Sequence, residues 1–139
     1  MKALLDTWVL SELRRNDGNP QVRATVNAIS DQDLYLSVLT IGEIIKGVTL
    51  LEPGRKKQAL QQWIYGLEES YADRILPIDM ETSTIWGEVT ALARARGIVV
   101  PAIDGLIAAT ALRHGLHLMT RNTADFAATG VLIVNPWEG

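Results

Sequence analysis

Short apolar runs alternate with longer amphipathic segments along the chain. Five runs are short enough for buried strands, at residues 3–5, 34–36, 74–76, 116–119 and 131–134. Between them, apolar residues recur at helical spacing within residues 40–51, 54–69, 81–96 and 103–113. Strands that alternate with helices need crossover connections, which favour parallel pairing and helices on both faces of the sheet. The pattern therefore predicts a three-layer α/β/α fold with a mainly parallel central sheet.

Length and composition narrow this picture without changing it. A chain of 139 residues suits one domain, so we expect residues 1–139 to fold as a single unit. Cysteine is absent, which excludes disulfides, thiolate metal sites and thiol nucleophiles. No apolar run approaches the roughly 20 residues of a membrane span, and the early charges of Asp6, Arg14 and Arg15 interrupt any secretion signal. We expect a cytoplasmic protein with no membrane contact.

The net charge of -3 bears on the partners that the chain can bind. Proteins that bind nucleic acid by long-range electrostatics alone are usually basic, so this class is disfavoured. A nuclease remains possible, because a divalent cation in its site carries positive charge to the phosphates. Basic residues also cluster at 14–15, 55–57 and 94–96. Solvated helix faces are the simpler interpretation of each cluster, and guidance of a nucleic acid is the alternative.

Four acids stand where the chemistry of such a fold is expected. Asp6 closes the first predicted strand, and open α/β sheets carry their sites at the carboxyl ends of strands. Glu43, Asp104 and Asp125 each fall in the expected first turn of a helix, where a capping box with Thr40 or the helix dipole would explain them structurally. Asp6 has no predicted helix to cap. We therefore expect it to need a metal or a partner from elsewhere in the fold.

If the four acids converge, their mutual repulsion selects the ligand. Two carboxylates about 5 Å apart repel by roughly 3 kcal/mol at an effective dielectric of about 20. Such a cluster must bind cations or take up protons. Oxygen ligands without histidine or cysteine favour Mg²⁺ or Mn²⁺ over zinc. These ions commonly serve phosphoryl chemistry, in which they activate water and stabilise the leaving oxygen.

Several short motifs occur in a fixed order along nearly the whole chain. They are Leu-Leu-Asp-Thr at 4–7, Leu-Ser-Val-Leu-Thr-Ile-Gly-Glu at 36–43, Asp-Gly-Leu-Ile-Ala-Ala-Thr-Ala at 104–111, Thr-Arg-Asn at 120–122, Asp-Phe at 125–126 and Asn-Pro-Trp at 135–137. With these motifs at this spacing, the chain resembles the PIN-domain ribonucleases. Within them it is similar to the VapC-like toxins of bacterial toxin–antitoxin pairs, including the FitB-like branch.

The resemblance implies a PIN-like fold and a catalytic role for all four acids. They would bind Mg²⁺ or Mn²⁺ and hydrolyse a phosphodiester bond of RNA by attack of metal-activated water. Asp6 and Asp104 match the metal ligands of the family, and Glu43 would hold or orient the metal or its water. Asp125 would be the fourth acid, although some relatives carry that acid at the position of Asn122.

Three further positions follow from the same resemblance. Thr120 and Asn122 would orient the acids through hydrogen bonds. Trp8 departs from the family pattern, since many relatives have asparagine at this place. An indole cannot accept a hydrogen bond, so Trp8 either packs against a neighbouring helix or partner subunit, or stacks on an RNA base.

The resemblance also implies partners. The expected protein is an endoribonuclease toxin silenced by a cognate antitoxin, forming a homodimer and reaching operator DNA only through the antitoxin. The alternative is a catalytically weak PIN-domain binding partner in an antitoxin–DNA regulatory complex. An aspartyl-phosphate phosphatase is disfavoured, because that chemistry needs a second aspartate where Trp8 stands.

Overall fold

Five parallel strands form the centre of the molecule. The computed structural model describes residues 1–138, and in this part of the chain the strand order is β3-β2-β1-β4-β5 with parallel pairing throughout. The strands are β1 (Ala3–Leu5), β2 (Leu34–Ser37), β3 (Ile75–Leu76), β4 (His117–Met119) and β5 (Ile133–Val134). All five lie where apolar runs predicted them, which confirms the parallel sheet.

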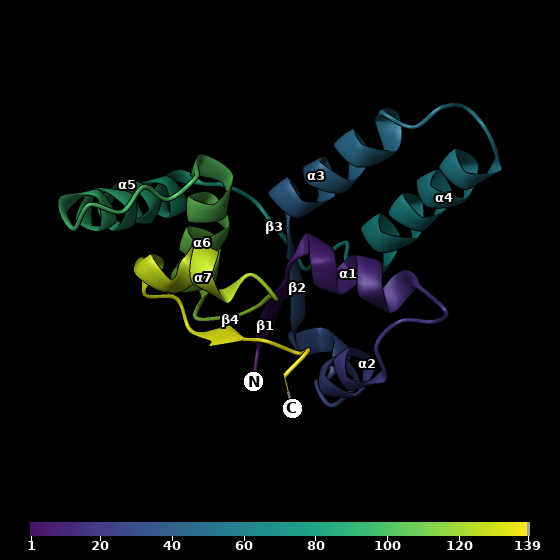
Figure 1. The fold of residues 1–139 in the computed structure, drawn as a ribbon, viewed down its shortest axis with the longest axis horizontal. Helices are drawn as coiled ribbons and strands as arrows, with labels where there is room; N and C mark the ends of the chain where they lie inside the picture. The colour runs from purple at the N-terminus through teal and green to yellow at the C-terminus, as the bar shows by residue number, and fades with distance from the viewer. Residues whose placement is uncertain (139) are drawn as a thin grey trace.

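Helices cover both faces of this sheet. They are α1 (Thr7–Arg14), α2 (Pro20–Asn27), α3 (Val38–Thr49), α4 (Arg55–Ser70), α5 (Met80–Ala95), α6 (Ala102–His114) and α7 (Thr123–Phe126). In Figure 1 the sheet stands between α1–α4 on one side and α5–α7 on the other. The predicted three-layer α/β/α arrangement is confirmed. Within residues 1–138, no helix has the length and apolar character needed to cross a membrane.

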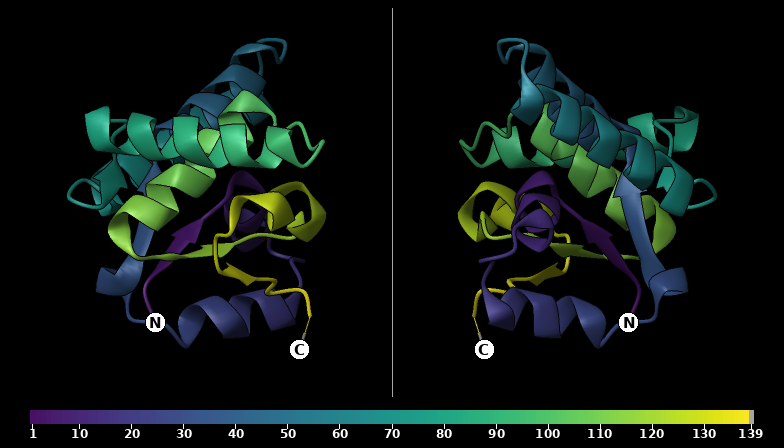
Figure 2. Two further views of the ribbon diagram at one scale, coloured as in Figure 1. Left: turned by 90° about the vertical axis from the view of Figure 1, so that its left-hand side faces the viewer. Right: turned by 90° about the vertical axis from the view of Figure 1, so that its right-hand side faces the viewer.

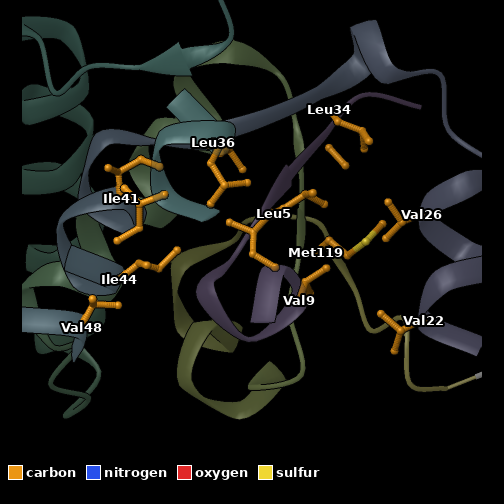
Figure 3. Close-up of a cluster of buried hydrophobic side chains, with 14 residues drawn as sticks. Leu5, Val9, Val22, Val26, Leu34, Leu36, Ile41, Ile44, Val48 and Met119 are labelled. Carbon is orange, nitrogen blue, oxygen red and sulfur yellow. The ribbon is translucent and has the colours of Figure 1, made fainter. Parts of the chain in front are cut away.

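The two faces of the sheet bury two separate hydrophobic clusters. Successive strand residues point to opposite faces, so Ala3 and Leu5 join one cluster while Leu4 joins the other. Figure 3 shows the first cluster, in which strand side chains such as Leu5 and Leu36 meet side chains from α1, α2 and α3. The second cluster packs α6 and α7 against β1 and β4. Burial on both faces explains why these strands are mostly apolar rather than alternating with polar residues.

The order of the strands creates a switch point beside β1. From β1 the chain moves outward through β2 to β3, and it then crosses to the other side to form β4 and β5. The views in Figure 2 show the long helical connections that this path requires. In open α/β sheets, ligands bind outside the carboxyl ends of the strands at such a point. Asp6 and Thr120 directly follow β1 and β4, the two strands that flank it.

Two helices were not predicted from the pattern. α1 and α2 span eight residues each and bury only two residues apiece, so their apolar periodicity is short. The start of α3 also differs from the prediction. Its cap is Ser37, whose hydroxyl accepts a hydrogen bond from the backbone N–H of Leu39 at 3.0 Å. The predicted capping box of Thr40 and Glu43 is therefore wrong, because α3 already begins at Val38 and Glu43 lies in its second turn.

Candidate active site

Asp6 lies at the junction of β1 and α1 and is only 5% exposed. One carboxylate oxygen accepts a hydrogen bond from the backbone N–H of Val9 at 2.9 Å, and the other accepts one from the hydroxyl of Thr120. The expectation that Asp6 has no helix to cap is wrong, since it is the N-cap of α1. Its carboxylate therefore stabilises the start of α1 and reaches across to the end of β4.

Thr120 is fully buried, and its hydroxyl is fixed from both sides. The backbone N–H of Asn122 donates to the Thr120 hydroxyl oxygen at 3.0 Å. The Thr120 hydroxyl therefore directs its own proton to Asp6. The backbone N–H of Asp6 donates to the carbonyl of Met119 at 3.2 Å. These bonds hold the ends of β1 and β4 in one orientation.

Burial raises the pKa of Asp6 above its ordinary value of 3.8. The hydrogen bonds from Thr120 and Val9 act in the opposite direction, because they stabilise the charged form. The carboxylate of Glu43 raises the pKa of Asp6 further. Asp6 and Glu43, 37 residues apart in sequence, are thus electrostatic neighbours in the fold.

Three of the four predicted acids line one cavity of about 60 Å³, which has room for more than one water molecule. The wall consists of Asp6, Thr7, Trp8, Glu43, Asp104, Ile107, Asn122 and Phe126. Among these described wall residues there is no lysine or arginine. The cavity therefore gathers negative charge without a cation in its wall.

Glu43 and Asp104 reach the cavity from different helices. Glu43 is exposed on α3, and its carboxylate accepts a hydrogen bond from the hydroxyl of Thr7 at 3.1 Å. Thr7 was not predicted as a site residue, although it lies within the Leu-Leu-Asp-Thr motif. Asp104 is half-buried in the first turn of α6. Burial raises the pKa of Asp104, and the carboxylates of Asp125 and Glu43 raise it further.

Asp125 lies outside this wall. It is an exposed residue of α7, and Asn122 occupies the cavity wall nearby in sequence. The charge of Asp125 still acts on Asp104, because it raises the pKa of that residue. Across residues 1–138, no group of three or more acidic or histidine side chains lies close enough to hold one metal ion together. The structure therefore brings together Asp6, Glu43 and Asp104 as wall residues but contains no single four-acid cluster.

A larger groove of about 360 Å³ adjoins this cavity, between α1, α3 and α4. Thr7 and Glu43 line both hollows. The groove also carries two cationic side chains, Arg14 and Lys56, and the guanidinium of Arg14 lies 5.6 Å from the ring centroid of Trp63. One residue from each of the basic clusters at 14–15 and 55–57 thus lines a groove that shares two lining residues with the carboxylate cavity.

Comparisons with known proteins agree over nearly the whole chain. A family model described as the PIN domain matches residues 3–132. The toxin FitB of Neisseria gonorrhoeae is 41% identical, with 97% of this chain and 98% of the toxin covered. The VapC ribonuclease Y4jK of Sinorhizobium fredii is 37% identical, with 97% of each chain covered.

Solved structures give the same result. The structure of FitAB bound to an IR36 DNA fragment matches with a TM-score of 0.92 and 38% identity, covering 99% of this chain and 96% of that one. A toxin–antitoxin complex from Klebsiella pneumoniae matches with a TM-score of 0.72 and 28% identity, covering 99% of this chain and all of that one. The match in fold extends from the first strand to the last.

Proposed function

Since this chain belongs to the PIN-domain family, we propose that it is an endoribonuclease toxin that cleaves phosphodiester bonds of RNA. The observation that carries the proposal is the shared cavity of Asp6, Glu43 and Asp104 at the carboxyl ends of the central strands. A relative that is 37% identical is named a VapC ribonuclease, and another that is 41% identical is named a toxin. Both match this chain over 97% of its length.

We propose Mg²⁺ or Mn²⁺ as the cofactor, held by Asp6 and Asp104. Mg²⁺ is commonly bound by one or two carboxylates, with waters and substrate phosphates completing its shell, so a group of three acids is not required. The donor set fits, because the wall offers carboxylate, hydroxyl and amide oxygens without sulfur or imidazole. A cation there would relieve the repulsion that raises the pKa of Asp104. When bound, it supplies Lewis-acid activation of water and of the phosphoryl group.

The residues of the chain itself hold and orient the reacting groups in this proposal. Thr120 and the N–H of Val9 fix the carboxylate of Asp6 so that it cannot rotate away from the cavity. The hydroxyl of Thr7 fixes one oxygen of Glu43. The other oxygen of Glu43 is then available to accept a hydrogen bond from the attacking water. Such positioning lowers the barrier, because the reacting atoms need not be brought together during the reaction.

Asn122 and Asp125 act around this centre. The backbone N–H of Asn122 fixes the Thr120 hydroxyl, and its side chain lines the cavity beside the carboxylates. Asp125 contributes negative charge near Asp104 from outside the wall. We therefore assign Asp125 a supporting electrostatic role in the catalytic group. Its removal should weaken catalysis less than removal of Asp6 or Asp104.

The groove supports RNA as the substrate. Its cations Arg14 and Lys56 lie next to a cavity whose own wall is acidic, so a phosphate backbone can follow the groove and reach the carboxylates once a cation is present. A positively charged groove with aromatic side chains is the usual arrangement for binding a single strand. Arg14 and Trp63 provide both features at one place.

We further propose that a cognate antitoxin neutralises this protein and that operator DNA is reached only through the antitoxin. A toxin–antitoxin complex and a DNA-bound FitAB assembly are among the structures that match its fold. A homodimer and a cytoplasmic location belong to the same proposal. Co-expression with the adjacent open reading frame, followed by size-exclusion chromatography, tests the binding of an antitoxin and the formation of a homodimer.

The mechanism is tested by RNA cleavage with two variants and one control. Asp6→Asn and Asp104→Asn should abolish Mg²⁺- or Mn²⁺-dependent cleavage of total bacterial RNA. Asp17→Asn removes a carboxylate that is 81% exposed and outside the cavity, and it should cleave as the wild type does. Cleavage by Asp6→Asn at the wild-type rate would refute the assignment.

Cation binding provides a second readout that does not depend on activity. A ligand that binds only the folded state adds about 2.7 kcal/mol of stability at 100 times its Kd. Mn²⁺ should therefore raise the Tm of the wild type and of Asp17→Asn but not that of Asp6→Asn. Equal shifts in all three proteins would place the cation elsewhere.

A second candidate is a catalytically weak partner in an antitoxin–DNA complex. The specific observation in its favour is that no three acids in the described chain can share one ion. A wild-type protein that binds its antitoxin tightly yet leaves RNA intact in the presence of Mn²⁺ would establish this function instead.

A further inference from the structure

Trp8 stands at the wall of the carboxylate cavity, yet most of its side chain faces solvent. It is 58% exposed and belongs to neither buried cluster. The packing role that the sequence allowed is therefore not present within this chain. We infer that Trp8 is a stacking platform for the RNA base next to the phosphate that is held at the carboxylates. This inference rests on the proposed endoribonuclease function and names a residue that positions its substrate.

The backbone that carries Trp8 is fixed on both sides. Asp6, two residues earlier, caps the helix through the N–H of Val9. Thr7, the preceding residue, donates its hydroxyl to Glu43 on α3. The backbone N–H of Trp8 itself lowers the pKa of Asp6, which places it beside that carboxylate. An aromatic ring on such a rigid turn can bind a flat partner at a small cost in conformational entropy.

The chemistry of the indole decides what it can bind here. An indole nitrogen only donates hydrogen bonds, so Trp8 cannot act as a ligand for a cation in the acidic cavity. Its exposed faces can instead stack on a base, and this contact suits any sequence because every base has a π-face. A ring at this wall can therefore hold a nucleotide while its phosphate lies at Asp6 and Asp104.

The carboxylate cavity and the adjoining groove offer different contacts to a single RNA strand. Trp8 lines the cavity but not the groove, whereas Arg14 and Lys56 line the groove but not the cavity. Thr7 and Glu43 line both. A single strand can thus place one base on Trp8 and its phosphate at the carboxylates, while the neighbouring phosphates follow the cations. An arrangement of aromatic and basic contacts of this kind is typical of single-strand binding.

Equilibrium binding to short single-stranded RNA tests the inference apart from cleavage. We would measure anisotropy of 5′-fluorescein-labelled A12 and U12 RNA in the presence of Ca²⁺, with wild type, Trp8→Ala, Trp8→Phe and Met80→Ala. Met80 is a matched control, because it is 81% exposed at the start of α5 and outside both hollows. Loss of one stacked base weakens binding by about 5- to 150-fold.

The expected pattern has three parts. Trp8→Ala weakens binding of A12 by that factor and of U12 by less, because a purine offers the larger stacking face. Trp8→Phe restores most of the affinity for A12, and Met80→Ala binds as the wild type does. The Mn²⁺-induced rise in Tm should be the same in Trp8→Ala as in the wild type, since the indole nitrogen offers no lone pair to a cation.

Four results would overturn the inference. They are wild-type affinity of Trp8→Ala for A12, equal weakness of Trp8→Phe and Trp8→Ala, a lost Mn²⁺ response in Trp8→Ala, and no binding of either RNA by the wild type. Wild-type RNA affinity of Trp8→Ala together with weakened antitoxin binding would assign the exposed ring to the protein partner instead. Failure of the wild type to cleave total bacterial RNA would refute the proposed function. The role of Trp8 in RNA binding is decided separately, by the binding measurements with A12 and U12.

Discussion

Replacing Thr120 by valine tests how the buried carboxylate of Asp6 is held. Valine has nearly the shape of threonine but no hydroxyl, so the variant loses the donor to Asp6 and the acceptor of the Asn122 N–H. A hydrogen bond to a charged group contributes about 1.5 to 3 kcal/mol, and a buried N–H left without an acceptor costs about 1 to 3 kcal/mol. The N–H of Asn122 is only part-buried, so its cost lies at the lower end of that range. We expect Thr120→Val to lower the free energy of unfolding by roughly 3 kcal/mol near neutral pH. For a domain of this size the Tm should fall by about 6 to 12 °C.

The loss should depend on pH with a definite sign. Burial raises the pKa of Asp6 above 3.8 in the folded state, and the Thr120 hydroxyl partly offsets this rise. Without that hydroxyl the pKa of Asp6 rises further. Because ionisation of a carboxyl with a raised pKa lowers stability, the extra loss in Thr120→Val develops as the pH rises from 3.8 through the raised pKa. Well below 3.8 Asp6 is protonated in both states, and only the smaller cost of neutral hydrogen bonds remains.

Urea unfolding in EDTA, at several pH values, measures this difference without interference from cations. Thr120→Ser is the matched control, because it keeps the hydroxyl and loses only a methyl group, at a cost of about 1 kcal/mol. The difference between the valine and serine variants should widen by about 1 to 2 kcal/mol between the acid and neutral ends of the series. A difference that does not change with pH would refute the claim that Thr120 stabilises the charged form of Asp6.

Three further predictions concern the scaffold. Asp79→Ala removes the side-chain cap of α5. Since the pKa of Asp79 is lowered below 3.8, the stability that its charge adds is present above pH 3.8 and disappears as the pH falls through the lowered pKa. The unfolding free energies of wild type and variant, measured in urea, should therefore converge at acid pH. Gly105→Ala places a Cβ 3.0 Å from the Trp86 side chain, and the resulting shift of α6 against α5 should lower the free energy of unfolding by about 1 to 3 kcal/mol. The control Gly87→Ala adds a Cβ that meets no atom within 4 Å, so it should not destabilise the protein. Arg74→Met removes hydrogen bonds from the guanidinium to three backbone carbonyls. We expect the free energy of unfolding to fall by roughly 3 kcal/mol, and a fall of less than about 1 kcal/mol would contradict the contribution of these bonds.

The strands and long helices were predictable because each depends on a local pattern. Strand β1 lies at the predicted residues, and the other four strands begin or end within two residues of the prediction. Burial on both faces demands continuous apolar runs, and such runs are visible in the sequence without knowledge of the partners. The alternation of these runs with helices then fixes parallel pairing, since two neighbouring strands with a helical crossover point in the same direction.

α1 and α2 were missed for a physical reason. Each is short, and in each only two residues are buried, so hydrophobic periodicity gives little signal. The signals that could have found them are the capping residues. Asn19 caps α2 and is followed by Pro20 at the first helical position, which is a characteristic helix start. Asp6 caps α1 in the same manner.

The roles of individual acids were less predictable than their presence. A capping box with Thr40 was the structural alternative for Glu43, but the end of β2 at Ser37 makes that serine the cap and moves Glu43 into the second turn of α3. From that turn its side chain reaches Thr7 and the cavity. For the fourth acid, the wall residue is Asn122 and not Asp125. Asn122 and Asp125 are three residues apart at the single turn of α7. Their spacing in the sequence does not show which of the two lines the cavity.

Asp6 shows why the structural and functional interpretations of an acid are not alternatives. Its carboxylate caps α1 through Val9 and binds Thr120 at the end of β4, so it stabilises the junction of three elements. Burial nevertheless raises its pKa, which means that the metal-free fold carries an energetic cost for its charge. Asparagine could accept the same bond from Val9 without that cost. The proposed cation would offset this cost at a carboxylate but not at an asparagine, so Asp6→Asn should leave the metal-free protein folded while removing the response to Mn²⁺.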